Sequence, residues 1–153
     1  VADIVEPLSK LIARARHRDD VELIYVNDNY GDFTAEPRDI VRTALDGARP
    51  DLVSPIVPEK GCRLLTKVRH SVFYATALDY LLGRLDVERV ILAGQVTEQC
   101  ILYSALDAYV RHFSVVVPPD AVAHIDADLG RAALRMMESN MSAELTSAAD
   151  CLH

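Results

Sequence analysis

The apolar positions along the chain alternate between two periodicities. Short aliphatic runs bounded by polar residues predict strands, of which three are clear and two are weaker. The clear strands are Val21–Val26, Arg89–Gly94 and Ser114–Pro118, and the weaker ones are Cys62–Lys67 and Ala143–Ser147. Apolar residues at helical spacing predict helices at residues 2–18, 38–45, 72–85, 97–111 and 126–140. This alternation predicts an α/β protein, with a mostly parallel, Rossmann-like sheet between helical layers in a three-layer α/β/α sandwich.

Composition narrows the class of protein further. The 153 residues include 16 Lys+Arg and 23 Asp+Glu, which gives a net charge of −7, and no dense basic stripe is present. Nucleic acid is therefore not expected as a partner. No apolar run reaches the ~20 residues of a membrane span, so no membrane association is expected. The cysteines, Cys62, Cys100 and Cys151, cannot all pair within one chain, and reduced thiols predict a cytoplasmic protein.

Chemistry is expected at the carboxyl ends of the strands, where ligands bind in parallel sheets. Three segments lie there: Asn27–Phe33, Lys67–Phe73 and Gly94–Cys100. In the last of these, Thr97 is predicted as a helix N-cap, which places Cys100 in the first helical turn. The helix dipole and the unpaired backbone N–H groups favour a thiolate there, and the same groups could stabilise an oxyanion. Glu98 would oppose the thiolate unless it points to solvent.

Each of the two candidate side chains also has a simpler interpretation. Cys100 could be a small buried apolar residue, which is a common fate of a single cysteine. Lys67 ends a short strand, where it could stabilise a nearby thiolate, but most lysines are solvated surface residues. The residues alone leave both alternatives open.

Together, these segments resemble the isochorismatase-like cysteine hydrolase superfamily, over about residues 21–123. Lys67–Phe73 (KVRHSVF) is similar to its K-x-R-x-S-A-F segment, with Val72 in place of alanine, and Gly94–Cys100 (GQVTEQC) is similar to G-x-x-T-[DE]-x-C. Val117–Ala121 resembles the strand end and turn that come next. The resemblance implies an Asp-Lys-Cys triad in which Cys100 is the nucleophile and Lys67 the lysine. It also implies an oxyanion hole at the backbone of Thr97 and Cys100, and a cis peptide between Val96 and Thr97.

The same resemblance places the triad aspartate of the family on a first strand. This chain has no counterpart of that strand or of its aspartate. Asp3 lies at a helix start and Asp28 ends the second strand, so neither is assigned to the triad. One explanation is a single domain, residues 1–153, that lacks an N-terminal strand present in the complete protein. The other is a truncated homologue. Removing a central strand would expose buried backbone groups at roughly 1–3 kcal/mol each, against a total stability of about 5–15 kcal/mol, which favours the first explanation.

The resemblance also bears on ligands. The loop after Val26 has no histidine in place of the family's D-x-H metal motif, so neither a metal nor another cofactor is expected. Candidate substrate-binding residues are Asn27, Asn29, Tyr30, Phe73 and Val96, although a turn explains the asparagines equally well.

The predicted function is a metal-independent cysteine hydrolase that cleaves a small amide-type C–N bond through a Cys100 thioester. The alternative is a non-catalytic small-molecule binding or assembly homologue with an incomplete triad, and a weaker third possibility is a redox sensor at Cys100. The resemblance implies a homo-oligomer, either a dimer or a tetramer.

Overall fold

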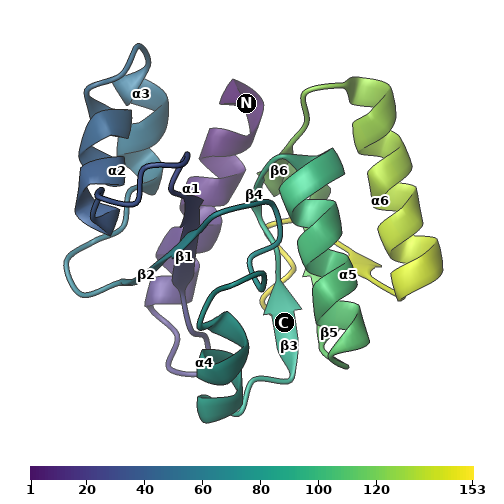
Figure 1. The fold of residues 1–153 in the computed structure, drawn as a ribbon. Helices are drawn as coiled ribbons and strands as arrows, with labels where there is room; N and C mark the ends of the chain where they lie inside the picture. The colour runs from purple at the N-terminus through teal and green to yellow at the C-terminus, as the bar shows by residue number, and fades with distance from the viewer.

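The computed structural model describes residues 1–153, and its helices and strands alternate along the chain (Figure 1). The strands are β1 (Ile24–Asp28), β2 (Arg63–Lys67), β3 (Arg89–Ile91), β4 (Gly94–Gln95), β5 (Ser114–Val117), β6 (Val122–Ala123) and β7 (Glu144–Leu145). The α-helices are α1 (Ala2–Arg16), α2 (Pro37–Leu45), α3 (Pro50–Val53), α4 (Leu78–Arg84), α5 (Leu102–Val110) and α6 (Ala127–Met141). Shorter helical turns are η1 (Ser54–Ile56), η2 (Thr97–Ile101) and η3 (Pro119–Ala121).

Every strand pair is parallel, which confirms the predicted parallel sheet. β1 pairs with β2, β5 lies between β3 and β7, and β4 pairs with β6. No strand pairing joins β1–β2 to β3–β5–β7, so the sheet is interrupted between these two groups. That a further strand fills this interruption stays a prediction.

Helices cover both faces of the sheet, as the aliphatic strands require. Along β5 the side chains alternate: Val115 and Val117 lie in a core with α4, α5 and α6, whereas Val116 lies in a core with α1. Figure 1 shows α1 on one side of the strands and α5 and α6 on the other. This confirms the three-layer α/β/α arrangement and places the carboxyl ends of β1 and β2 near the start of the helix that carries Cys100.

Several predicted elements have different boundaries. The strand predicted over Arg89–Gly94 is divided into β3 and β4, the first helix ends at Arg16, and the last strand covers only Glu144 and Leu145. The first strand begins at Ile24 rather than Val21 and continues through Asn27 and Asp28, which were expected in a loop. They continue the parallel ladder because they pair with Thr66 and Lys67 of β2. The polar end of this strand thus has a fixed position relative to Lys67.

The predicted helix 72–85 is shorter, because α4 begins only at Leu78. Side chains bind the backbone in the preceding turns: the Ser71 hydroxyl accepts from the Phe73 amide, and the Thr76 hydroxyl donates to the Val72 carbonyl. Such local bonds compete with helical ones. The sequence pattern did not predict β6, nor did it predict α3 and η1 in the proline-rich connection.

Candidate active site

The register of β1 and β2 brings together a carboxylate and an ammonium group. Asp28 and Lys67 are direct partners in the parallel ladder, and the Asn29 amide extends it by donating to the Lys67 carbonyl. Lys67 Nζ donates to Asp28 Oδ1 over 2.8 Å. The lysine side chain is 4% exposed and the aspartate 29%. A buried ammonium needs such a counter-charge, so the pair holds Lys67 in a defined position.

The same ammonium also contacts the cysteine. Lys67 Nζ lies 3.6 Å from Cys100 Sγ, within hydrogen-bonding range for sulfur. Cys100 is half-buried, and neither Cys62 nor Cys151 forms a disulfide with it. A cation at this distance stabilises negative charge on sulfur. The structure therefore brings Cys100 and Lys67 together and adds Asp28 as the third member of the cluster.

Asp28 is the functional candidate that the sequence interpretation set aside. It was excluded because it ends the second strand, yet the register places its side chain beside that of Lys67. A usable signal was present: two parallel strands that each end in an ionisable residue of opposite sign.

Cys100 lies in the first turn of a helix that starts with a π-helical turn, η2, and continues as α5. The N-cap is Val96, without a side-chain cap, so Thr97 is the first helical residue rather than the predicted cap. The Thr97 side chain is almost fully buried, and its hydroxyl caps no backbone amide and has no partner within the protein. The cis peptide joins Gln95 to Val96, one bond earlier than expected, because the extended Val96 already precedes the helix.

Glu98 does not act on the thiol in the way that the sequence suggested. Its carboxylate accepts hydrogen bonds from the amides of Ile125, at 2.8 Å, and Asp126, at 2.9 Å. Burial raises the pKa of Glu98, but these amide donors lower it by more, and the net pKa lies below its ordinary value. Glu98 thus connects η2 to the loop before α6.

The predicted substrate-binding residues differ in their exposure and in their distance from the cysteine turn along the chain. Phe73 is a correction: it is 5% exposed and stacks on Phe113 in the core, because its segment turns inward instead of forming a helix. Asn29 is buried, and its side-chain oxygen accepts from the Gly31 amide, which is a turn contact. Tyr30 is 82% exposed and Asn27 is also exposed. Val96 is half-buried next to Thr97, beside the cysteine turn.

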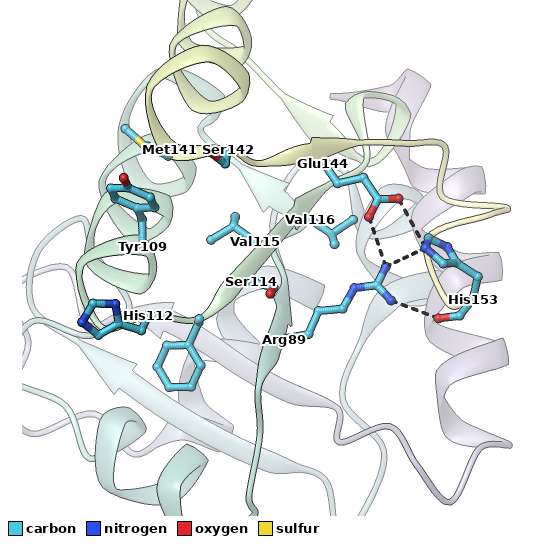
Figure 2. Close-up of a pocket in the computed structure, with 11 residues that line it drawn as sticks. Arg89, Tyr109, His112, Ser114, Val115, Val116, Met141, Ser142, Glu144 and His153 are labelled. Atoms are coloured by element: carbon cyan, nitrogen blue, oxygen red, sulfur yellow. Dashed lines mark hydrogen bonds and ion pairs between the residues drawn. The ribbon is translucent and has the colours of Figure 1, made fainter.

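A pocket of about 560 Å³ lies at the opposite end of the strands. It opens where β3 and β5 begin, at Arg89 and Ser114, and has no cysteine or lysine in its wall. Figure 2 shows Arg89 pointing at Glu144 and His153, and its guanidinium donates to the His153 carbonyl over 3.0 Å. These groups satisfy one another and fix the C-terminal segment. We therefore take the cluster around Cys100, rather than this pocket, as the candidate active site.

No group of three or more His, Cys, Asp and Glu side chains has the arrangement of a metal site. None of the helices combines the length and apolar character that crossing a bilayer requires.

Comparison with known proteins identifies the family. The family model described as the Isochorismatase domain matches residues 1–150. The chain belongs to the isochorismatase family. It is 36% identical over 125 residues to the isochorismatase family protein YaaI of Bacillus subtilis, a match that covers 82% of this chain and 69% of YaaI.

Solved structures agree with this assignment. An isochorismatase-like hydrolase from Alkaliphilus metalliredigens superposes with a TM-score of 0.80 at 22% identity, covering 98% of this chain and 82% of that one. The N-carbamoylsarcosine amidase of Thermoplasma acidophilum superposes with a TM-score of 0.76 at 27% identity, covering 97% and 84%. The first shows the same fold, and the name of the second describes an enzyme that cleaves a C–N bond.

Proposed function

We propose that this isochorismatase-family protein is a metal-independent cysteine amidase that hydrolyses a small amide through a Cys100 thioester. The observation that carries the proposal is the contact chain from Asp28 through Lys67 to Cys100, with steps of 2.8 and 3.6 Å. The relationship to an amidase over nearly the whole chain supports the same class of reaction.

In the first half of the reaction, the Cys100 thiol passes its proton to the Asp28 carboxylate, and the sulfur attacks the amide carbon. Lys67 balances the negative charge on sulfur, and backbone N–H groups at Thr97 and Cys100 receive the developing oxyanion. The C–N bond then breaks, and the leaving amine takes the proton from Asp28. An acyl group remains on Cys100 as a thioester.

In the second half, water adds to the thioester carbon while Asp28 accepts a proton from it. The C–S bond breaks, the carboxylic acid leaves, and the proton returns to the thiolate. Atoms and charges balance over the cycle, which consumes one amide and one water. No redox partner is required.

The test is the Cys100→Ala variant, assayed on a panel of small amides. We expect turnover to fall to background, because no other nucleophile lies at the site, while the circular dichroism spectrum stays unchanged. Mass spectrometry of wild-type protein quenched during turnover should show an acyl adduct on the peptide that contains Cys100. Retained turnover by the variant would rule out the covalent mechanism.

The non-catalytic alternative predicts a different result in the same experiment. Wild-type protein would then bind amides without an adduct and without product. Self-association, as a dimer or tetramer, also stays a proposal, and light scattering of the purified protein tests it directly.

A further inference from the structure

The outer side of α5 exposes apolar residues only. Four residues of this helix are exposed, and all of them are aromatic or aliphatic: Tyr103 at 43%, Leu106 at 47%, Tyr109 at 44% and Val110 at 56%. The exposed residues of α1, by contrast, include acids and bases such as Glu6 and Lys10. A surface helix normally presents polar residues to water, and a helix that is apolar all round is normally buried. α5 therefore has the sequence of a helix that is covered on both sides.

Within the chain, α5 is covered on its inner side alone. Its small residues Ser104, Ala105 and Ala108 are buried, and the helix packs against α6, η2 and β5. Figure 1 shows α5 and α6 side by side at the outside of the molecule. On the outer side, Tyr103, Leu106 and Val110 follow one another at intervals of three and four residues, which places them in one stripe. This spacing is that of the seam along which two helices pack with interleaved side chains.

The stripe has the size that an interface requires. At roughly 150–250 Å² for a fully exposed side chain, the four exposed residues of α5 present about 350 Å². That area is comparable with the largest apolar patch of a typical single protein, about 300–600 Å², and such patches are often functional. A standard interface covers about 800 Å² on each partner, of which roughly 60% is apolar. The stripe thus supplies most of the apolar part of such an interface.

The segment that follows β2 borders the stripe and extends it. The rings of His70 and Tyr103 meet edge to face with centroids 5.5 Å apart, and the Val72 amide donates to the Ser104 hydroxyl over 3.0 Å. In the same segment Val68 is 41% exposed. The apolar face therefore continues from α5 onto a second element with a polar edge at His70.

The charges around the stripe indicate which partner it fits. Asp107 is the one charged residue of α5, and Arg111 pairs with it over 2.9 Å. The stripe is thus neutral, although the chain has a net charge of −7. An anionic membrane would require lysines or arginines along the helix, and α5 has neither. Two copies of an acidic protein repel each other over most of their surface, and a neutral apolar face lets them meet without opposing like charges.

We propose that α5 packs antiparallel on α5 of a second copy of this chain, about a twofold axis near Leu106. An interface across such an axis brings one patch against itself, which a neutral apolar stripe permits. Tyr103 would then lie opposite Val110 of the partner subunit, a large side chain against a small one, and the two helix dipoles would oppose each other. This inference identifies the surface for the self-association proposed above, and it does not depend on the amidase function.

The experiment measures the mass of the full chain in solution by light scattering over a range of micromolar concentrations. We expect the wild type to have twice the mass of the 16.9 kDa chain, or a multiple of that dimer. Leu106→Asp places two acids near the axis and should raise the dissociation constant by about 100-fold or more. The matched control is Met136→Asp on α6, since Met136 is 46% exposed and lies outside the stripe. Its mass should equal that of the wild type, and circular dichroism should show both variants folded.

A cysteine variant tests the axis without adding charge. A residue near a twofold axis lies beside its own copy, so Leu106→Cys should form a disulfide-linked dimer on air oxidation, whereas Met136→Cys should not. Peptide mapping would locate the linkage at the introduced thiol. A monomeric wild type, an unchanged mass for Leu106→Asp, or an equal loss of mass in both aspartate variants would overturn the inference. None of these outcomes bears on amide turnover, which is measured separately.

Discussion

At the proposed site, a single buried lysine contacts both a carboxylate and a thiol. Lys67 is 4% exposed, and an ammonium group is stable at such a position only with partners close by. Asp28 supplies the charge, and Cys100 lies on the other side of the same nitrogen. The effect of substitutions at these positions therefore depends on whether they leave the ammonium unpaired.

Replacement of Asp28 by asparagine keeps the shape of the side chain but removes the counter-charge and the proton acceptor. We expect kcat to fall by about 10²–10⁴-fold, the usual contribution of a general acid–base group. Steady-state assays on a turned-over amide measure this loss. The control is Asp32→Asn, since Asp32 lies four residues later, is itself exposed, and accepts only from Thr34 and the Ala35 amide in its own turn. Near-normal turnover by Asp28→Asn would show that another group moves the proton.

The three thiols should differ in their rates of alkylation. Iodoacetamide is expected to modify Cys100 first, because the Lys67 ammonium lies 3.6 Å from its sulfur and balances the negative charge of the attacking atom. Cys151 should react only after unfolding, since it is fully buried and burial raises the pKa of its thiol. Peptide mapping over a time course at pH 7.5 gives the three rates. Lys67→Met should slow Cys100 alone, and equal rates at Cys62 and Cys100 in the wild type would contradict the interpretation.

At the scale of elements, the attachment of η2 to the start of α6 should make stability depend on pH. The pKa of Glu98 is lowered on folding, although burial opposes this, because the amides of Asp126 and Ile125 donate to its carboxylate. Because the pKa of Glu98 is lower in the folded protein than in the unfolded chain, its carboxylate stabilises the fold fully at a pH above about 4.5, the ordinary pKa. This stabilisation is lost as the pH falls through the pKa of the folded state. The wild type should therefore lose this contribution below pH 4.5.

The Glu98→Gln variant tests that dependence. We expect it to be less stable than the wild type at pH 7 by roughly 1 kcal/mol, a typical net hydrogen-bond contribution, and the difference to shrink towards pH 3. Thermal melts across this range measure it. Glu138→Gln on the exposed side of α6 is the control and should show no such trend. A constant difference at all pH values would mean that the charge of Glu98 has no part in the attachment.

The elements also show what a single sequence can predict. Periodicity located β5, α1 and α6, because aliphatic runs and helical spacing report burial directly. It failed at residues 72–77, where the hydroxyls of Ser71 and Thr76 bind the backbone and prevent a helix. Cys100 and Lys67 could be identified from motifs. The place of Asp28 was missed, since it follows from the register of β1 on β2, and the nearly continuous apolar run of a strand covered on both faces leaves that register open.

Over the whole molecule, the site depends on the core that α5, α6 and β5 share. Met137 is at its centre with no exposed surface, and α6 packs directly against η2, which carries Cys100. Replacing this side chain with alanine should cost about 2–5 kcal/mol, because the cavity cannot fully collapse between packed helices. Against a total of about 5–15 kcal/mol, that loss is a large part of the stability of the fold.

Adjacent Met136 provides the matched control, since the same substitution there removes a side chain that is 46% exposed. Met136→Ala should change the free energy of unfolding by no more than about 0.5 kcal/mol. Urea denaturation of the two variants and the wild type gives both values. We also expect Met137→Ala to lower the rate of Cys100 alkylation relative to Cys62 in the native state, because the turn that holds the thiol near Lys67 loses its support. Equal stabilities of the two variants would show that α6 does not provide the core on which the site is built.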